Sequence, residues 1–359
     1  MLSSTSSFER YIPDRGHTRK LLIGLLGGLL LVLLFENLFR GLGVRPNIRE
    51  TASLWAIQRE LATAAGAEKL ILVGASRSQL GVDIEELERL SNRPVVQLAI
   101  DGSPYLRVLE HLADDQSVRG TIIVATTLDR LVSTPGLSRS DQWIDEYESN
   151  YRDRGYLKIE NNLVAMLQSA SALYANVVPL TVLFSSITQG SGLPISYIVT
   201  QSNRERNADY NLPTYPDIYI ARVMSTLELS LPLREFDDLD QFETAILRVA
   251  RANLVETDVD DMDLSVVQAQ LAKLRQRGVE VVFVRFPMSG AVEAINNIRY
   301  PKALWDRVMS ELDARTIDYR DYPQLDYELV DGSHLDIRQK TEFTRNLFQI
   351  LEQQVPQRQ

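Results

Sequence analysis

The sequence contains no cysteine and only three histidines among its 359 residues. The absence of cysteine excludes disulfide bonds, cysteine nucleophiles and zinc–thiolate sites. The sequence also lacks a concentrated basic patch, and its net charge is −10. Because a nucleic-acid surface needs clustered positive charge to neutralise phosphates, we expect no nucleic-acid partner.

Acidic residues are frequent between Glu256 and Asp263. This stretch lacks the glycine and the ligand spacing of a calcium-binding loop, so it is more typical of the solvated start of a helix. We therefore expect neither a metal ion nor a cofactor.

An uninterrupted apolar run extends from Leu21 to Phe35 and is followed by no small-x-small cleavage pattern. These features favour an uncleaved transmembrane anchor over residues 21–40 rather than a signal peptide. Basic residues before the run favour a cytoplasmic tail over 1–20 and a main domain in the periplasm or outside the cell, although basic residues after it weaken this asymmetry. The alternative, a buried core helix, would need a large protein body around the run.

Apolar strand patterns alternate with helical patterns along the rest of the chain. Such alternation predicts an α/β fold with a doubly wound, mainly five-stranded parallel sheet, because parallel neighbours need crossovers and helices cover both faces. The predicted strands are 69–73, 94–100, 120–126, 279–286 and 316–319. The predicted helices are 50–65, 83–90, 105–113, 264–277, 301–314 and 337–352.

A long insertion, roughly 133–257, separates the third and fourth predicted strands. It begins with helical patterns over 143–154 and 163–173 and continues into a loop region near 190–215. Insertions at the ligand edge of such sheets form lids or partner surfaces, and a structural embellishment is an equal alternative. The predicted organisation is thus a linker helix within 41–66 and one domain over 67–355 that contains the insertion.

Two segments carry the residues of a Ser/His/Asp site. The first predicted strand ends at Gly74-Ala75-Ser76-Arg77, and the chain later contains Asp331-Gly332-Ser333-His334. His17 precedes the apolar run and His111 lies within a helical pattern, which leaves His334 as the candidate base. A serine needs such a base to become a nucleophile, and Asp331 would hold the imidazole tautomer.

Each of these assignments has a structural alternative. Ser76 would serve equally well as the cap of the following helix. His334 would be a surface residue if Asp331 or Ser333 capped the last helix. Asp336 is interpreted as an acid at the start of that helix rather than as part of the site.

These segments resemble blocks of the SGNH or GDSL esterase-like hydrolases. Gly74-Ala75-Ser76 is similar to the first block, with Ala75 in the place of the aspartate, and Gly102 matches the second. Asp331-Gly332-Ser333-His334 matches the last block, whereas Ala125-Thr126-Thr127-Leu128-Asp129 lacks the asparagine of the third. The resemblance implies an SGNH-like, flavodoxin-like sheet over about 68 to the final helix, without the insertion.

The predicted oxyanion donors are the backbone N–H groups of Ser76 and Gly102, and Thr126 or Thr127 would replace the missing asparagine. Arg77 and Arg285 are candidate binding residues for an anionic or polyhydroxylated substrate. Ion pairs with acids in the insertion would explain both arginines equally well.

An anchored chain with an arginine after the serine also resembles envelope proteins related to exopolysaccharide acetylation factors and to the teichoic-acid D-alanylation protein. The resemblance implies a serine acyl-esterase or O-acyltransferase that acts on an envelope glycan or an acyl donor, beside a multispanning O-acyltransferase. The alternative is a non-catalytic docking module in which the SGNH-like fold persists.

Overall fold

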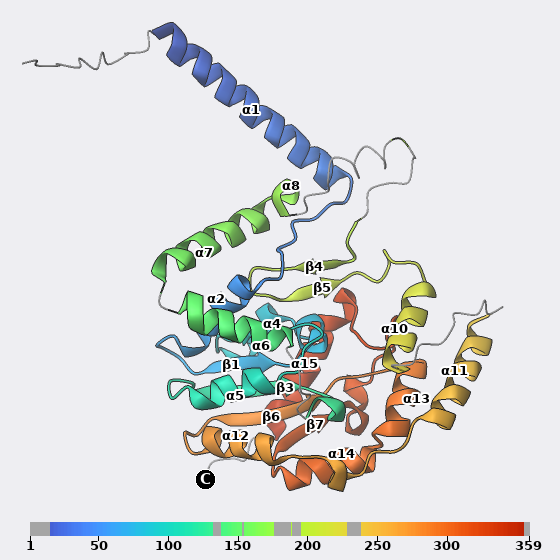
Figure 1. The fold of residues 1–359 in the computed structure, drawn as a ribbon. Helices are drawn as coiled ribbons and strands as arrows, with labels where there is room; N and C mark the ends of the chain where they lie inside the picture. The colour runs from blue at the N-terminus through green and yellow to red at the C-terminus, as the bar shows by residue number, and fades with distance from the viewer. Residues whose placement is uncertain are drawn as a thin grey trace, which may run out of the picture.

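A five-stranded, fully parallel sheet forms the centre of the protein (Figure 1). The computed structural model describes residues 15–131, 138–152, 154–175, 188, 195–227 and 238–354. The strand order is β2-β1-β3-β6-β7, so the predicted α/β class and the predicted number of parallel strands are confirmed. The strands are β1 (Lys69–Val73), β2 (Val95–Gln97), β3 (Gly120–Ala125), β6 (Glu280–Arg285) and β7 (Arg315–Asp318).

β2 is shorter than the predicted strand over 94–100. Backbone bonding to its neighbour nevertheless continues beyond it, because the N–H of Leu98 donates to Leu72 O at 2.8 Å and that of Ile100 to Gly74 O at 3.1 Å. These bonds carry the chain to Asp101 and Gly102 beside the end of β1.

Helices cover both faces of the sheet, as a doubly wound arrangement requires. One hydrophobic core lies against Ile71 and Val124, and the other lies against Leu70 and Val282. The first core is covered by α2 (Ala52–Thr63), α5 (Leu106–Asp114), α12 (Ser265–Arg275) and α14 (Lys302–Glu311). The second is covered by α4 (Ile84–Ser91), α10 (Asp217–Leu227), α11 (Leu239–Asn253), α13 (Gly290–Arg299) and α15 (Ile337–Gln353).

α2 lies within the predicted linker over 41–66 but packs as part of the body. Trp55 on this helix is fully buried, and its indole N–H donates to the carbonyl of Leu98 at 3.0 Å. The description of this segment as a linker was therefore wrong, since its apolar face completes one of the two cores.

The segment between β3 and β6 contains more regular structure than the sequence predicted. The helical pattern over 143–154 corresponds to α6 (Arg139–Glu146) and a π-helical turn over Tyr147–Tyr151. α7 (Gly155–Ala170) and α8 (Ala172–Ala175) follow.

The predicted loop near 190–215 contains a hairpin of β4 (Ile198–Thr200) and β5 (Arg206–Ala208), so that prediction was wrong for these residues. Strands of three residues are too short to produce a periodic pattern. The glycines at 190 and 192 and the proline at 194 lie outside the described residues.

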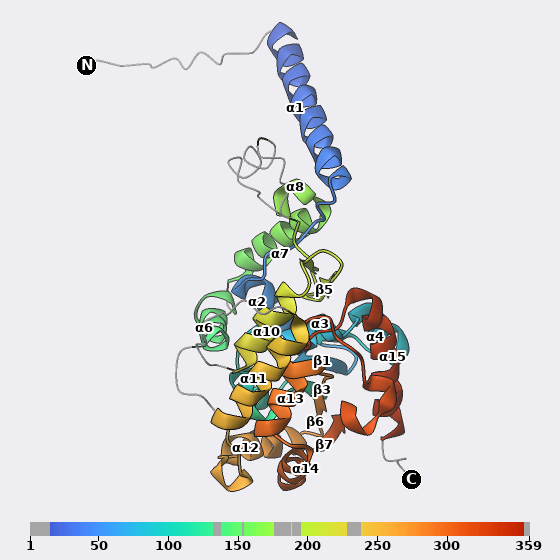
Figure 2. The same cartoon turned by 90° about the vertical axis from the view of Figure 1, so that its right-hand side faces the viewer.

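α1 (Arg15–Gly41) projects from the body, as Figures 1 and 2 show. Its segment Gly16–Gly41 is long and apolar enough to cross a membrane, and it is not buried within the structure. This exposure contradicts the alternative of a buried core helix. The predicted orientation across the membrane stays a prediction.

Candidate active site

Three side chains from two distant segments of the sequence form one hydrogen-bonded series. The distance between Ser76 Oγ and His334 Nε2 is 2.8 Å, and the distance between His334 Nδ1 and Asp331 Oδ2 is also 2.8 Å. His334 and Asp331 are both buried. The structure thus brings together the three residues that the sequence selected, in the geometry of a nucleophile, a base and an orienting acid.

Both structural alternatives for these residues are wrong. Ser76 is the first residue of α3 (Ser76–Gly81) and Ala75 occupies the cap position, so the hydroxyl of Ser76 is left to contact His334. The last helix, α15, is capped by Asp336, which accepts a hydrogen bond from the N–H of Arg338 at 2.8 Å. Asp336 therefore acts at the helix start, as interpreted, while Asp331 remains available to His334.

A sharp turn after β1 presents Ser76. Gly74 adopts a φ of +140°, and a Cβ at this position would lie 2.5 Å from the carbonyl oxygen of Ala125. Only glycine fits this close approach of two backbones, because any side chain would push β1 and β3 apart. The turn lets the chain leave the sheet and enter α3 with the serine at the strand end.

The carboxylate of Asp331 is surrounded by donors. Its Oδ1 accepts from the N–H groups of Ser333 at 2.9 Å and His334 at 2.8 Å, and its Oδ2 accepts from Tyr210 Oη at 2.9 Å. Arg222 Nε lies 3.4 Å from Oδ2. Burial alone would raise the pKa of Asp331, but the bonds from His334 and Ser333 and the charge of Arg222 lower it well below its usual range. The ionised acid can then hold the His334 tautomer whose Nε2 accepts the serine proton.

The surroundings of His334 favour its neutral form. Burial lowers the pKa of His334, and the charges of Arg222 and Arg77 lower it further, against the opposing effect of Asp331. A base must be unprotonated to accept a proton, so this shift favours the reactive form at and below neutral pH.

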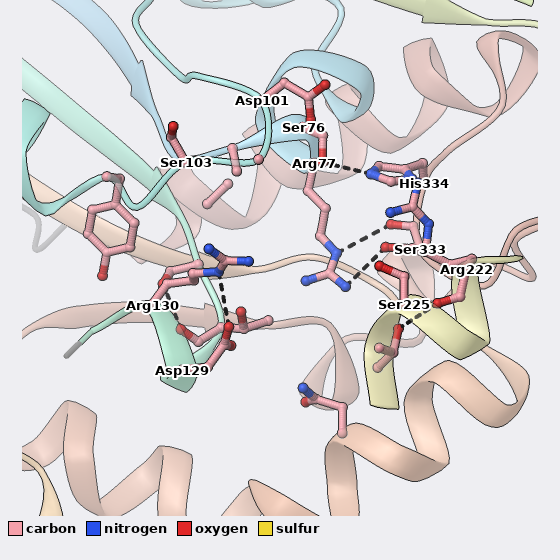
Figure 3. Close-up of a pocket in the computed structure, with 18 of the residues that line it drawn as sticks. Ser76, Arg77, Asp101, Ser103, Asp129, Arg130, Arg222, Ser225, Ser333 and His334 are labelled. Carbon is pink, nitrogen blue, oxygen red and sulfur yellow. Dashed lines mark hydrogen bonds and ion pairs between the residues drawn. The ribbon is translucent and has the colours of Figure 1, made fainter. Parts of the chain in front are cut away.

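The series opens into a cavity of about 290 Å³ at the carboxyl ends of the strands (Figure 3). Ser76, Gly102 and Thr127 contribute to its walls from the sheet, while Arg222 and Ser225 contribute from α10 of the insertion. This is the edge at which ligands bind in doubly wound sheets.

Of the predicted oxyanion donors, Ser76, Gly102 and Thr127 line this cavity, which agrees with the role predicted for them. Gly102 has a φ of +67°, a conformation that glycine adopts readily. Thr126 also lines the cavity, but its N–H donates to Val284 O at 3.0 Å and its hydroxyl donates to Thr127 O at 2.9 Å. Because both donors are used within the fold, the assignment of Thr126 as an oxyanion donor was wrong.

The two candidate arginines differ in position. Arg77 lies in the middle of the cavity in Figure 3 and donates to the carbonyl and the hydroxyl oxygens of Ser333, at 3.3 and 3.1 Å. Arg285 is 1% exposed, donates to Asn296 Oδ1 at 2.6 Å and lies over the ring of Trp305. Its place at a strand end predicted a substrate contact, but the side chain is covered by α13 and α14, so that prediction was wrong.

Sequence reasoning missed Tyr210 and Arg222, which both contact Asp331. Neither lies in a motif, and the chain separation between Tyr210 and Asp331 is 121 residues. Tyr210 lies in the loop before α10 and Arg222 lies within α10, and the only signal for either was the position of the insertion at the ligand edge.

No family model matches the chain, and no curated protein matches it. The SGNH-like resemblance therefore rests on the sequence motifs alone. Among the residues that the structure describes, no group of three or more histidines and acids could hold a metal ion. In the acidic stretch after Glu256, Asp258 caps a short 3-10 turn over Val259–Asp261 and Asp263 accepts from Ser265.

Proposed function

We propose that this protein is a serine acyl-esterase or O-acyltransferase that works through an acyl-serine intermediate. The observation that carries the proposal is the continuous series from Ser76 Oγ through His334 to Asp331, with 2.8 Å at both contacts. A serine hydroxyl within hydrogen-bond reach of a neutral imidazole, itself held by a buried carboxylate, is the arrangement that acyl transfer requires.

The reaction would proceed in two steps. Ser76 Oγ attacks the ester carbonyl carbon while His334 Nε2 takes the hydroxyl proton, and His334 then returns this proton to the departing alcohol oxygen. In the second step His334 takes a proton from water or from a sugar hydroxyl, whose oxygen attacks the acyl carbon. The bond between that carbon and Ser76 Oγ then breaks, and His334 returns the proton to Ser76 Oγ. Water gives a carboxylic acid, and a sugar gives a new ester.

The oxyanion of each tetrahedral intermediate would be stabilised by the N–H groups of Ser76 and Gly102, and Thr127 is the remaining candidate for the role of the absent asparagine. One such donor contributes about 3 kcal/mol of transition-state stabilisation. A site with two donors would therefore be slower than a complete one and still be active.

The SGNH-like family assignment is part of the proposal. It is supported by the position of the serine after the first strand, the glycine beyond the second, and the Asp-x-x-His turn directly before the last helix. An anchor in α1 favours an envelope glycan as the acyl acceptor or donor and a multispanning O-acyltransferase as a partner. We also propose that the domain lies in the periplasm or outside the cell, which the basic residues before the apolar run support.

The test uses the full-length chain in detergent or nanodiscs. A fluorophosphonate probe should label Ser76, as located by peptide mass spectrometry, and 4-nitrophenyl acetate should be hydrolysed. Ser76→Ala should abolish the label, and His334→Ala should abolish turnover. Ser78→Ala is the matched control, because Ser78 lies on the same helix but its hydroxyl contacts Gln97.

A folded wild type that neither reacts with the probe nor hydrolyses esters would contradict the enzymatic proposal. It would favour the docking-module alternative, which the missing third-block asparagine supports. Circular dichroism of every variant would separate a loss of chemistry from a loss of fold.

A further inference from the structure

The cavity beside Ser76 is lined by four arginines and only two aspartates. The arginines are Arg77, Arg130, Arg222 and Arg299, and the aspartates are Asp101 and Asp129. The lining therefore has an excess of arginines, although Arg222 contacts the buried Asp331 and Arg130 contacts Asp129, whereas the whole chain carries a net charge of −10. A cleft of one sign inside a protein of the other sign concentrates ligands of opposite charge.

Both aspartates of the lining already contact an arginine. Asp101 accepts from Arg206 Nη1 at 2.8 Å, and Asp129 lies 3.0 Å from Arg130 Nε. The hydrogen bonds that join Arg77 to Ser333 go to uncharged oxygen atoms. Arg77 is half-buried, and the charges of Asp129 and Asp331 act on it from nearby, but neither carboxylate is hydrogen-bonded to it. Among the four arginines of the lining, Arg77 is therefore the best placed to bind an anion from outside the chain.

The position of Arg77 indicates where that partner would lie. Figure 3 shows its guanidinium in the centre of the cavity, between Asp129 and Arg130 on one side and Arg222 and Ser225 on the other. A guanidinium recognises a carboxylate through two parallel hydrogen bonds. The hydroxyl of Ser225, which also lines the cavity, suits a hydroxyl group of a sugar, whereas the hydroxyl of Thr226 donates to Arg222 O at 2.9 Å within α10.

We propose that the cavity selects esters of acidic sugars, with a carboxylate of the substrate bound by Arg77. The preference for acidic esters as substrates rests on the proposed acyl transfer, whereas the binding of an acidic sugar does not depend on it. The inference specifies that the glycan is anionic, whereas the sequence motifs allowed either an anionic or a polyhydroxylated substrate.

The test compares acetylated oligogalacturonides with acetylated xylo-oligosaccharides as substrates of the full-length chain. We expect kcat/KM to be at least tenfold higher for the acidic esters at low salt, and the preference to shrink as salt rises. Arg77→Gln should reduce the ratio of acidic to neutral kcat/KM. Equal kcat/KM for the two substrates would overturn the inference.

Binding separates this inference from the proposed function. Calorimetry of Ser76→Ala with unacetylated trigalacturonate and with xylotriose requires no chemistry. Tighter binding of trigalacturonate that Arg77→Gln weakens would support the acidic-sugar site even if 4-nitrophenyl acetate is not hydrolysed. Equal binding of the two sugars, or no binding of either, would overturn it even if the ester is hydrolysed.

A second inference rests on the surface of α7. Five large side chains on this helix are exposed: Tyr156 at 63%, Ile159 at 73%, Leu163 at 51%, Met166 at 57% and Leu167 at 45%. Their spacing of three, four, three and one residues places them on one stripe of the helix. The opposite side carries Ala165, the buried residue of α7, and packs toward α2.

α7 lies directly beside the end of the apolar helix α1. Arg40 of α1 donates to the carbonyl of Ala170 at 2.7 Å, and the carboxylate of Glu36 accepts from the N–H groups of Ala172 and Leu173 at 2.8 and 3.1 Å. In both Figures 1 and 2, α7 runs away from the base of α1 across its axis rather than along it. A bilayer spanned by α1 would therefore have its surface close to α7.

We propose that α7 lies in the headgroup region of that bilayer, with the stripe of exposed apolar side chains facing the lipid. An amphipathic helix with one apolar face is stabilised in this position because the bilayer covers surface that water would otherwise contact. Such a contact would fix the orientation of the sheet, and of the cavity, relative to the membrane. The proposal rests on α1 as a membrane span and is independent of the chemistry at Ser76.

The absence of cysteine permits a direct test. Single cysteines at Ile159 and Met166 of the full-length chain would carry nitroxide labels in nanodiscs of phosphatidylethanolamine and phosphatidylglycerol that contain one chain and no other protein. We expect high accessibility to oxygen and low accessibility to a water-soluble nickel chelate. Val255→Cys, 80% exposed after α11, and Glu311→Cys, exposed at the end of α14, are controls that should be accessible to nickel.

Nickel accessibility at Ile159 and Met166 equal to that of the controls would overturn the proposal. Protection that appears only when two chains share a disc would also overturn it, because a second copy would then be the occupant. Protection that needs an added multispanning protein would assign the stripe to that protein instead of to lipid.

Discussion

The loops at the carboxyl ends of the strands and the segment between β3 and β6 both reach the site, but they contribute different parts of it. The strand-end loop at Ser76 and the turn over 331–334 contribute the proposed nucleophile, base and acid. The inserted segment contributes Tyr210 and Arg222, which both contact Asp331, and Arg222 also lines the cavity.

The difference lies in what each region needs from its neighbours. The turn over 331–334 is held by its own backbone, since Asp331 accepts from two N–H groups of that turn. Tyr210 and Arg222 come from elements far away in the chain and act only through the tertiary contact. The side chains proposed to react thus come from short local motifs. The insertion adds contacts that help to position Asp331 and to lower the pKa values of Asp331 and His334. Four substitutions test this division.

The largest effect is expected from the acid of the local motif. Asp331→Asn should lower kcat about 10⁴-fold with 4-nitrophenyl acetate, because an amide favours the wrong imidazole tautomer. Asp336→Asn, at the helix cap five residues later, should change kcat far less. A loss below about 100-fold for Asp331→Asn would show that the acid does not orient His334.

A smaller effect is expected from Tyr210→Phe, which removes the hydrogen bond to Asp331 and keeps the ring. Burial and the charge of Asp331 raise the pKa of Tyr210, so its hydroxyl is a proton donor throughout the working range. We expect kcat to fall about tenfold, equivalent to about 1.4 kcal/mol. The control is Tyr197→Phe, whose ring centroid lies 5.6 Å from that of Tyr210, and equal losses in both variants would remove the special role of Tyr210.

Arg222→Gln should act through pH. The charge of Arg222 lowers the pKa of His334, so its removal raises that pKa. More of His334 is then protonated at acidic pH, and the acid limb of kcat/KM should move to higher pH, with a several-fold greater loss at pH 6 than at pH 8. Arg222→Lys should restore the wild-type limb, and an unchanged profile in Arg222→Gln would contradict this coupling.

The smallest effect on activity is expected from Thr126→Val. An oxyanion donor is worth roughly 10²–10³ in kcat, but both donors of Thr126 are used within the fold, so kcat should change by less than about threefold. The free energy of unfolding should fall by about 1 kcal/mol, because the hydroxyl bond to Thr127 is lost. A 100-fold loss of kcat with an unchanged melting temperature would show that Thr126 does act as an oxyanion donor.

Much of the fold was predictable because its signals are local. The buried strands are continuous apolar runs, and each predicted strand corresponds to a strand of the sheet within a few residues. α13 was not predicted, since Gly290 and the two asparagines at 296 and 297 weaken its helical pattern. The hairpin of β4 and β5 was missed because three-residue strands depend on their partner for stability.

The sequence by itself determined the parallel α/β sheet, the apolar helix at the N-terminus, and the identity of Ser76, Asp331 and His334, because each follows from neighbouring residues. Only the tertiary structure decided that Arg285 is buried, that Thr126 has no free donor, and that Tyr210 and Arg222 contact Asp331. The physical reason is that composition and periodicity report which side chains avoid water and how the local backbone runs. The partner of a hydrogen bond more than a hundred residues away depends on how the elements pack, and no local pattern records it.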